Sequence, residues 1–286
     1  MLVVVAPGQG AQAPGFLSPW LEVDGVADHL AWLSAVADLD LVQHGTTSDA
    51  DEIRDTAVAQ PLLVAAGLVT ASALGGGTRL PIDAAAGHSV GEITAASLAG
   101  VLTEEQAIVL VRERGRAMAA AAAQAPTGMT AVMGGDVDAV VAAIEGHGLT
   151  AANVNGAGQV VAAGTAEQLA ALAADPPPKA RLRPLAVAGA FHTTHMAPAV
   201  DRLASVTSGM PTRDPRVRLL ANGDGAVVTS GRDVVDRLVA QVSSPVRWDA
   251  CMQTMLDVGA TGMLELAPSG TLTGLARRGL PDVETF

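Results

Sequence analysis

Short runs of apolar residues recur along the chain, separated by longer stretches rich in alanine and leucine. The clearest runs are Leu2–Ala6, Ala84–Ala86 and Val217–Ala221. Continuous apolar runs are typical of strands buried on both faces, and their alternation with helical stretches is typical of a parallel sheet covered by helices. The pattern therefore predicts a layered α/β core.

The stretch 104–120 has the clearest helical signal. Thr103 is suited to cap its N-terminus, acidic residues occupy the first turn, and arginines follow further along, including Arg114. This order of charges suits the helix dipole, and a threonine before an acidic first turn is a common helix start. We therefore expect a helix here.

From about residue 129 the pattern changes to a compact series of short strands and helices. The expected order is strand, helix, strand, strand, helix, strand, at 130–133, 137–145, 151–154, 159–163, 166–174 and 182–187. Asn155-Gly156 between two of these strands is a hairpin signal. The order is that of a ferredoxin-like unit. We predict a large parallel-sheet α/β domain, 1–127 and 189–286, with a ferredoxin-like βαββαβ subdomain inserted at 128–188.

Charge and cysteine content argue against several classes of protein. The chain has 29 acidic and 17 basic side chains, a net charge of −12, which disfavours nucleic acid and anionic lipid as partners. The single cysteine, Cys251, has no partner for an intramolecular disulfide. Zinc sites need several Cys or His ligands close together, so we expect no metal.

Although 49% of the residues are hydrophobic, no uninterrupted apolar run is long enough to cross a bilayer. The first apolar run follows no basic segment and ends early at Pro7-Gly8, which favours a buried strand over a signal peptide. No sustained heptad pattern indicates a coiled coil. We therefore expect a cytoplasmic protein that does not span a membrane and is a monomer.

The sharpest local motif is Gly87-His88-Ser89-Val90-Gly91, which fits G-x-S-x-G. It lies between an apolar strand-like run and a predicted helix at 92–98, the context of a nucleophile elbow. Glycines on both sides of Ser89 permit a strained turn, and helix N-terminal N–H groups favour developing negative charge. The alternative is a glycine-rich turn with an incidental serine, which this strand-turn-helix context disfavours.

A serine hydroxyl needs a base within hydrogen-bond reach. His88 adjoins Ser89, but successive side chains in a tight turn diverge. The other histidines are His29, His44, His147, His192 and His195, of which the first three lie in polar surroundings that favour the surface. His192 and His195 remain, where the chain leaves the predicted subdomain. On the residues alone, each could be the base or a structural histidine.

Seven motifs extend the pattern over the whole chain. They are Pro7-Gly8-Gln9-Gly10-Ala11-Gln12, Gln60-Pro61, Gly87-His88-Ser89-Val90-Gly91-Glu92, Arg112-Glu113-Arg114-Gly115, Asn155-Gly156-Ala157-Gly158-Gln159-Val160-Val161, Ala190-Phe191-His192 and Ser244-Pro245-Val246-Arg247-Trp248. In this order they resemble malonyl-CoA:acyl carrier protein transacylases and the related acyltransferase domains of polyketide synthases. Seven ordered motifs are far more specific than the serine motif alone.

The resemblance implies that the large α/β domain is a hydrolase-like catalytic core, in which Ser89 is the acylated nucleophile and His192 its base. It implies that Gln241 holds the histidine through its backbone carbonyl, which makes a dyad without a carboxylate. The backbone N–H groups of Gln9 and Val90 would form the oxyanion hole.

Four further residues match substrate-binding positions of the family. Arg114 would bind the free carboxylate of a malonyl group, for which a planar guanidinium is well suited. Gln60 and Asn155 match pocket positions. Phe191 is similar to the residue of malonyl-selective polyketide acyltransferases, where a ring beside the base crowds a branching methyl group. The resemblance thus favours malonyl over methylmalonyl.

The implied reaction is ping-pong transfer of a malonyl group from malonyl-CoA to the phosphopantetheine thiol of an acyl carrier protein, in fatty-acid or polyketide synthesis. No metal or redox cofactor is implied. Carrier proteins of this type are acidic, so a chain of net charge −12 would need a local basic dock. The candidate residues are Lys179, Arg181 and Arg183, or Arg277 and Arg278.

Two other classes fit part of the pattern. A serine esterase or lipase would explain the elbow, but that fold usually has its histidine near the C-terminus, whereas the last histidine here is His195. A catalytically silent carrier-protein-binding module is the second alternative. The absence of an acyl adduct on Ser89 would support it.

Overall fold

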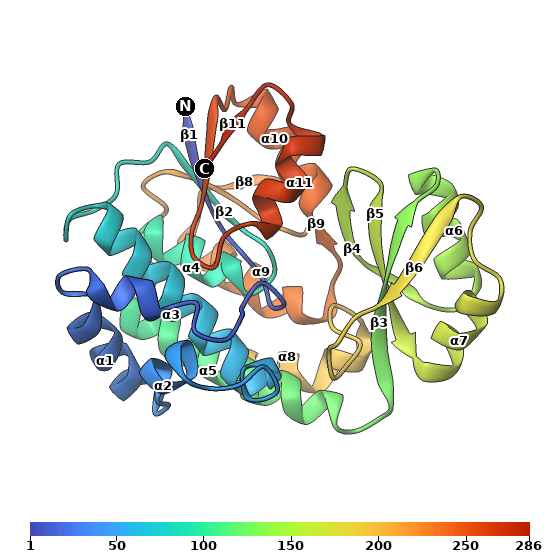
Figure 1. The fold of residues 1–286 in the computed structure, drawn as a ribbon, viewed down its shortest axis with the longest axis horizontal. Helices are drawn as coiled ribbons and strands as arrows, with labels where there is room; N and C mark the ends of the chain where they lie inside the picture. The colour runs from blue at the N-terminus through green and yellow to red at the C-terminus, as the bar shows by residue number, and fades with distance from the viewer.

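The computed structural model describes residues 1–286, in which a large and a small sheet lie side by side (Figure 1). The large sheet has six strands in the order β11-β10-β1-β2-β7-β8. Its strands are β1 (Leu2–Ala6), β2 (Ala84–Gly87), β7 (Arg218–Leu220), β8 (Val227–Val228), β10 (Gly262–Glu265) and β11 (Glu284–Thr285). All neighbours are parallel except β7 and β8. The predicted hydrolase-like core is confirmed.

The strand predictions differ in accuracy. β1 has the predicted bounds, and its residues from Val3 onward are buried, as expected for a strand covered on both faces. The run predicted at 217–221 is a strand only over Arg218–Leu220. It ends there because Ala221 already donates to the carbonyl of Ala226 in the turn toward β8.

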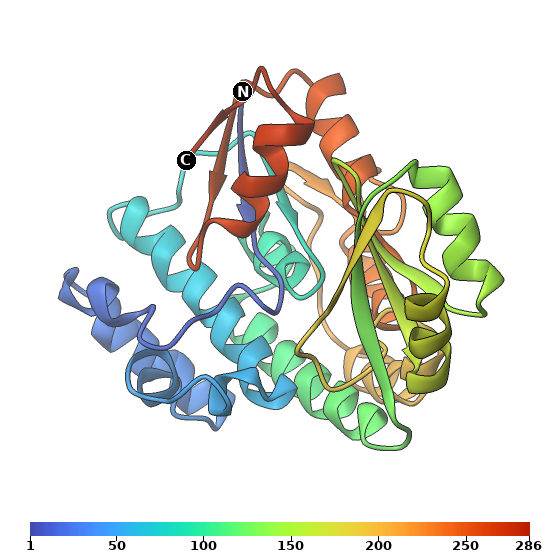
Figure 2. The same cartoon turned by 45° about the vertical axis from the view of Figure 1, so that its right-hand side comes forward.

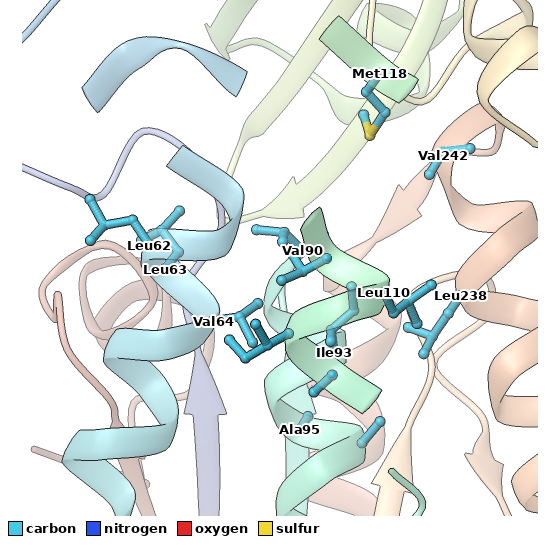
Figure 3. Packing of buried hydrophobic residues seen from close by; sticks show 14 of the residues in the cluster. Leu62, Leu63, Val64, Val90, Ile93, Ala95, Leu110, Met118, Leu238 and Val242 are labelled. Atoms are coloured by element: carbon cyan, nitrogen blue, oxygen red, sulfur yellow. The ribbon is translucent and has the colours of Figure 1, made fainter. Parts of the chain in front are cut away.

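Helices pack on both faces of the large sheet and on one another. They are α1 (Val26–Ala37), α2 (Leu41–Thr46), α3 (Thr56–Leu74), α4 (Gly91–Leu98), α5 (Glu104–Ala122), α8 (Ala197–Thr207), α9 (Gly231–Ala240), α10 (Trp248–Asp257) and α11 (Thr271–Gly279). Short 3-10 helices are η1 (Ser18–Glu22), η2 (Glu52–Arg54), η3 (Thr194–Met196) and η4 (Gln241–Ser243). Figure 3 shows Val64 of α3 beside Val90 and Ile93 at the start of α4. This packing fixes the helix that follows the serine.

α3 alone is long and apolar enough, by length and composition, to cross a membrane. However, 72% of its most apolar window is buried inside the protein. It is therefore accounted for as a core helix, packed between α4 and α5.

The predicted helix at 104–120 is confirmed and extends to Ala122. Thr103 accepts a hydrogen bond from the N–H of Gln106, whose side chain accepts one from the N–H of Thr103, so both members of a capping box are present. Further along, Gly115 passes so close to α3 that a Cβ there would lie 2.9 Å from the carbonyl oxygen of Thr56. This close approach brings Arg114 beside the N-terminal half of α3.

The small sheet has the strand order β6-β3-β5-β4-β9. Its elements are β3 (Thr127–Gly134), α6 (Val137–Gly146), β4 (Thr150–Gly156), β5 (Gln159–Thr165), α7 (Ala166–Ala174), β6 (Ala180–Pro184) and β9 (Val246–Arg247). The first four strands in this order form the predicted ferredoxin-like arrangement. In Figures 1 and 2, α6 and α7 cover the face of this sheet that is turned away from the large sheet.

Two features of the small sheet were not predicted. The last strand is Ala180–Pro184 rather than 182–187, because its register with β3 begins at Ala180 and ends at Pro184. In addition, β9, which follows α9 in the chain, pairs in parallel with β4. The division into domains 1–127 with 189–286 and 128–188 stays a prediction.

Candidate active site

The serine follows β2 at the carboxyl edge of the large sheet. Ala6 at the end of β1 is in register with Gly87 at the end of β2, so the loops after both strands begin side by side. Ser89 has a φ of 53°, a left-handed conformation that is strained for a residue with a side chain. A Cβ on Gly87 would lie 2.0 Å from the carbonyl carbon of Gly91. The motif therefore needs glycine there to close the turn.

His192 reaches the serine across 103 residues of chain. Its Nε2 lies 2.7 Å from Ser89 Oγ, and its Nδ1–H donates to the backbone oxygen of Gln241 at 2.8 Å. Because the carbonyl accepts from Nδ1, the Nε2 lone pair is turned toward the hydroxyl. His195 lies in η3 and does not line the serine cavity. The arrangement can therefore act as a serine–histidine dyad, with His192 as the histidine.

The electrostatic environment keeps this imidazole neutral. Burial lowers the pKa of His192 to about 3, and the positive charge of Arg114 acts in the same direction. His192 is only 3% exposed. A neutral imidazole is the form that can accept a proton from the serine, so His192 has at neutral pH the protonation state that a general base needs.

This pKa leads to a prediction for the pH dependence of acylation. The base-competent form is lost only as pH falls through the folded pKa, so kcat/KM for acylation should stay constant from pH 7.5 down to about pH 5. The rate is measured by thiol release from a malonyl thioester of N-acetylcysteamine, which has no titrating phosphate, with protein-free hydrolysis as the control. An inflection near the ordinary histidine pKa of 6.5 would contradict it.

A buried guanidinium lies beside the same hydroxyl. Arg114 donates to the side-chain oxygens of Gln60 at 2.6 Å and Gln241 at 2.7 Å, and lies 3.3 Å from Ser89 Oγ. Burial lowers the pKa of Arg114 to about 10, opposed by the nearby Glu92 charge, so the group stays cationic at neutral pH. No carboxylate lies within ion-pair distance of it. A buried cation held by two amides is suited to bind a substrate anion.

The serine and arginine open into a common cavity of about 70 Å³. Its lining residues include Gln9, Gln60, His88, Val90, Met118, Phe191 and His192. The backbone N–H groups of Gln9 and Val90 have no hydrogen-bond partner within the protein. Two free donors in the cavity that Ser89 lines suit a developing oxyanion.

Asn155 lies behind His88 and does not line the cavity. Its side-chain oxygen lies 2.8 Å from His88 Nε2, and its amide donates to Gln159 at 2.9 Å. The ring of His88 also packs on Trp248, with 5.7 Å between ring centroids. Direct contact of Asn155 with substrate stays a prediction, whereas its bond to His88 is observed.

The structure adds a buried polar network that the residue patterns did not indicate. The side chain of Asn222 accepts from the N–H of Ser89 and donates to the carbonyl of Gly87, both at 2.7 Å. Its own N–H donates to Glu92 at 2.6 Å, and Glu92 also accepts from the side chain of Gln241. Burial raises the pKa of Glu92 to about 8, against the effect of these bonds. The network joins the elbow to the residue that holds His192.

Glu92 had a sequence signal, because it ends the serine motif, but nothing local to Asn222 marks it. We expect Asn222→Ala to lower the free energy of unfolding by about 2–4 kcal/mol, since the buried carbonyl of Gly87 and the part-buried N–H of Ser89 lose their partner. The rate of Ser89 acylation should fall by about 10–100-fold, because the elbow can relax.

The measurements are thermal unfolding and the single-turnover rate of acylation. Thr70→Val is the matched control, since Thr70 is equally buried but bonds only to its own helix. An Asn222 variant that loses stability yet acylates at the wild-type rate would show a purely structural residue. That result would contradict a positioning role.

Comparison with known proteins agrees with this geometry. The family model for the acyl transferase domain matches residues 3–285. The malonyl CoA-acyl carrier protein transacylase of Mycobacterium tuberculosis (strain ATCC 25618 / H37Rv) is 50% identical, covering 99% of this chain and 94% of the relative.

Two solved structures extend the likeness to the fold. A crystal structure of MCAT from Mycobacterium tuberculosis is 49% identical, with a TM-score of 0.96 over 100% of this chain and 95% of that one. A malonyl-transacylase in complex with a type II PKS acyl-carrier protein is 30% identical, with a TM-score of 0.92 over 99% and 94%. Because both the sequence match and the fold span nearly its whole length, the chain belongs to the acyltransferase family, among the malonyl CoA-acyl carrier protein transacylases.

Proposed function

We propose that this chain transfers a malonyl group from malonyl-CoA to the phosphopantetheine thiol of an acyl carrier protein through an acyl-Ser89 intermediate. The observation that carries the proposal is that the hydroxyl oxygen of Ser89 lies close to both His192 and Arg114. Ser89 Oγ lies 2.7 Å from a neutral imidazole and 3.3 Å from a buried guanidinium. The first partner suits nucleophilic attack, and the second suits a substrate with a carboxylate.

In the first half-reaction, Ser89 Oγ bonds to the thioester carbon while its proton passes to His192 Nε2. The oxygen of the tetrahedral intermediate would accept from the N–H groups of Gln9 and Val90, each such donor contributing about 3 kcal/mol in comparable sites. The carbon–sulfur bond then breaks, and His192 returns the proton to the coenzyme A sulfur. The malonyl group remains on Ser89 as an ester.

The second half-reaction reverses these steps with a different thiol. The carrier protein's phosphopantetheine thiol gives its proton to His192 Nε2, and its sulfur bonds to the ester carbon. The carbon–oxygen bond breaks and the proton returns to Ser89 Oγ, so the protein is regenerated. The fixed bond from His192 Nδ1–H to Gln241 keeps Nε2 available in both halves.

Arg114 and Phe191 would select the acyl group. The guanidinium of Arg114 would bind the malonyl carboxylate. Gln60 and Gln241 would hold the guanidinium in place through its other N–H groups. Phe191 is 6% exposed and lines the cavity immediately before the base, where a methyl branch next to the thioester would meet its ring. The expected order of preference is malonyl, then methylmalonyl, then acetyl.

Intact-mass analysis after mixing the protein with malonyl-, methylmalonyl- or acetyl-CoA tests the proposal. We expect a malonyl adduct that disappears when a phosphopantetheinylated carrier protein is added and reappears on that protein. Hydrolysis as the dominant fate of the adduct would indicate a serine esterase. No adduct with any thioester would indicate a silent binding module.

The carrier protein would dock on the basic edge of the small sheet. Lys179, Arg181 and Arg183 are exposed on or beside β6, an edge strand, and none of them forms an ion pair. The chain continues from β6 to Leu185 and Val187, which line the serine cavity. This continuity favours a carrier-protein dock at β6 over one at Arg277 and Arg278 of α11.

We expect the double variant Arg181→Glu and Arg183→Glu to raise KM for an acidic carrier protein by about tenfold or more, with KM for malonyl-CoA unchanged. Steady-state kinetics with each substrate varied in turn measures both constants. Arg277→Glu with Arg278→Glu changes the charge equally and serves as the control. An equal rise in both KM values would contradict the dock.

The expected monomer and cytoplasmic location remain part of this proposal. Both active-site partners, Ser89 and His192, come from the same chain, so the dyad needs no second subunit. Light scattering of the purified protein tests the first point. Fractionation of the source cells tests the second.

A further inference from the structure

A second cavity lies away from the serine. Its volume is about 510 Å³, whereas the cavity at Ser89 measures about 70 Å³. Its walls come from the C-terminal ends of α3 and α4, the loop 77–82, the segment 100–106 that leads into α5, and the segment 211–216. The loop 77–82 leads into the start of β2, whereas Ser89 follows its end. The cavity therefore lies toward the amino edge of the large sheet.

One wall of this cavity is aliphatic and its rim is basic. Leu68, Ala71, Leu80, Ile82, Leu98 and Val101 supply aliphatic side chains. Three exposed guanidinium groups, those of Arg79, Arg213 and Arg216, line the same cavity and form neither an ion pair nor a side-chain hydrogen bond. Glu104 also lines it, but its carboxylate is 2.6 Å from His29. These three arginines give the rim a local positive charge in a chain with a net charge of −12.

The basic rim is held in place by backbone contacts. The N–H of Arg216 donates to the carbonyl of Ala99 at 2.9 Å, and that of Arg213 to Val101 at 3.3 Å. The side chain of Gln106 donates to the carbonyl of Pro211 at 2.9 Å. A Cβ on Gly100 would lie 3.0 Å from Arg216 Nε, so this side chain lies directly over the turn between α4 and α5.

We propose that this cavity binds a small amphipathic anion, with an aliphatic part on the apolar wall and a carboxylate or phosphate on Arg213 and Arg216. Ligand cavities of about 300–1,000 Å³ accept molecules of this size. Guanidinium groups bind both headgroups through paired, charge-assisted hydrogen bonds. The proposal concerns a site separate from Ser89, and it stands whether or not the proposed transfer reaction is correct.

Calorimetric titration of the full chain with octanoate, octyl phosphate, 1-octanol and acetate tests it. We expect at least one of the two amphipathic anions to bind, and the tighter one identifies the headgroup. Octanol and acetate should each bind at least about tenfold more weakly, because octanol has no anionic headgroup for the arginines and acetate has no chain for the apolar wall.

The double variant Arg213→Gln and Arg216→Gln should weaken binding of the amphipathic anion by about tenfold or more. The control, Arg277→Gln with Arg278→Gln, removes two exposed arginines from α11 and should leave the affinity unchanged. Thermal unfolding of both variants checks that they are folded.

The carboxylate-binding Arg114 could capture the same probes, so the titration is repeated with saturating malonyl-CoA. Binding should persist, because the ligand and the acyl group occupy different cavities. Displacement by malonyl-CoA, undiminished affinity in the Arg213 and Arg216 variant, or octanol binding as tightly as the anions would each overturn the proposal. So would failure of both anions to bind.

Discussion

Replacing Ser89 by alanine is expected to abolish the malonyl adduct and to slow transfer to the carrier protein by about four orders of magnitude or more. The reason is the position of a single atom. Ser89 Oγ stands between the imidazole of His192, at 2.7 Å, and the guanidinium of Arg114, at 3.3 Å. Without this oxygen, no atom between the proposed base and the proposed carboxylate site can form an ester with the acyl group.

Intact mass after mixing with malonyl-CoA and a carrier-protein transfer assay measure the two effects. Ser205→Ala removes an exposed serine hydroxyl from α8 and is the matched control. Thermal unfolding of the Ser89 variant checks that the loss is chemical. A malonyl adduct that persists in Ser89→Ala, or transfer within about tenfold of the wild type, would reject the acyl-serine mechanism.

The nucleophile elbow could be predicted from sequence because its causes are local. Gly87 lies two residues before Ser89, and its need for small size follows from the turn itself, because a Cβ there would meet the backbone of Gly91 and Glu92. The apolar run before the motif forms β2, and the helix after it is α4, one residue longer than predicted. Local steric rules were enough here.

The histidine partner could not be settled by the same local rules. His192 and His195 stand three residues apart in similar surroundings, and the residues alone left both open. What separates them is the fold. His192, with a φ of 62°, is held by η4 through its N–H to Val242 and its Nδ1–H to Gln241. Only the resemblance to a family selected between them in advance.

The supporting network was beyond prediction for a related reason. Asn222 follows β7, whose neighbour in the sheet is β2, and this pairing places it under the elbow. Its sequence surroundings are those of an ordinary turn. Likewise, β9 has two residues and gains its strand character only by pairing with β4. Short elements defined by a distant partner carry too little local signal to be recognised.

Replacing Arg114 by alanine is expected to remove the preference for carboxylated acyl groups. We expect kcat/KM for malonyl-CoA to fall by about 10²–10³-fold, the effect of losing paired charge-assisted hydrogen bonds, while the value for acetyl-CoA changes little. Arg112→Ala is the matched control, because it removes an arginine of α5 that bonds to Glu113 and does not line the serine cavity.

The contrast between two Arg114 variants separates binding from packing. Arg114→Ala also leaves the side-chain oxygens of Gln60 and Gln241 without their donor. A cavity disturbed in this way would itself lower kcat/KM. Such a disturbance would slow malonyl and acetyl transfer alike. Arg114→Lys keeps the charge but lacks the planar fork, and its malonyl preference should lie between those of the wild type and Arg114→Ala. An unchanged ratio of malonyl to acetyl kcat/KM in Arg114→Ala would exclude the guanidinium as the carboxylate site.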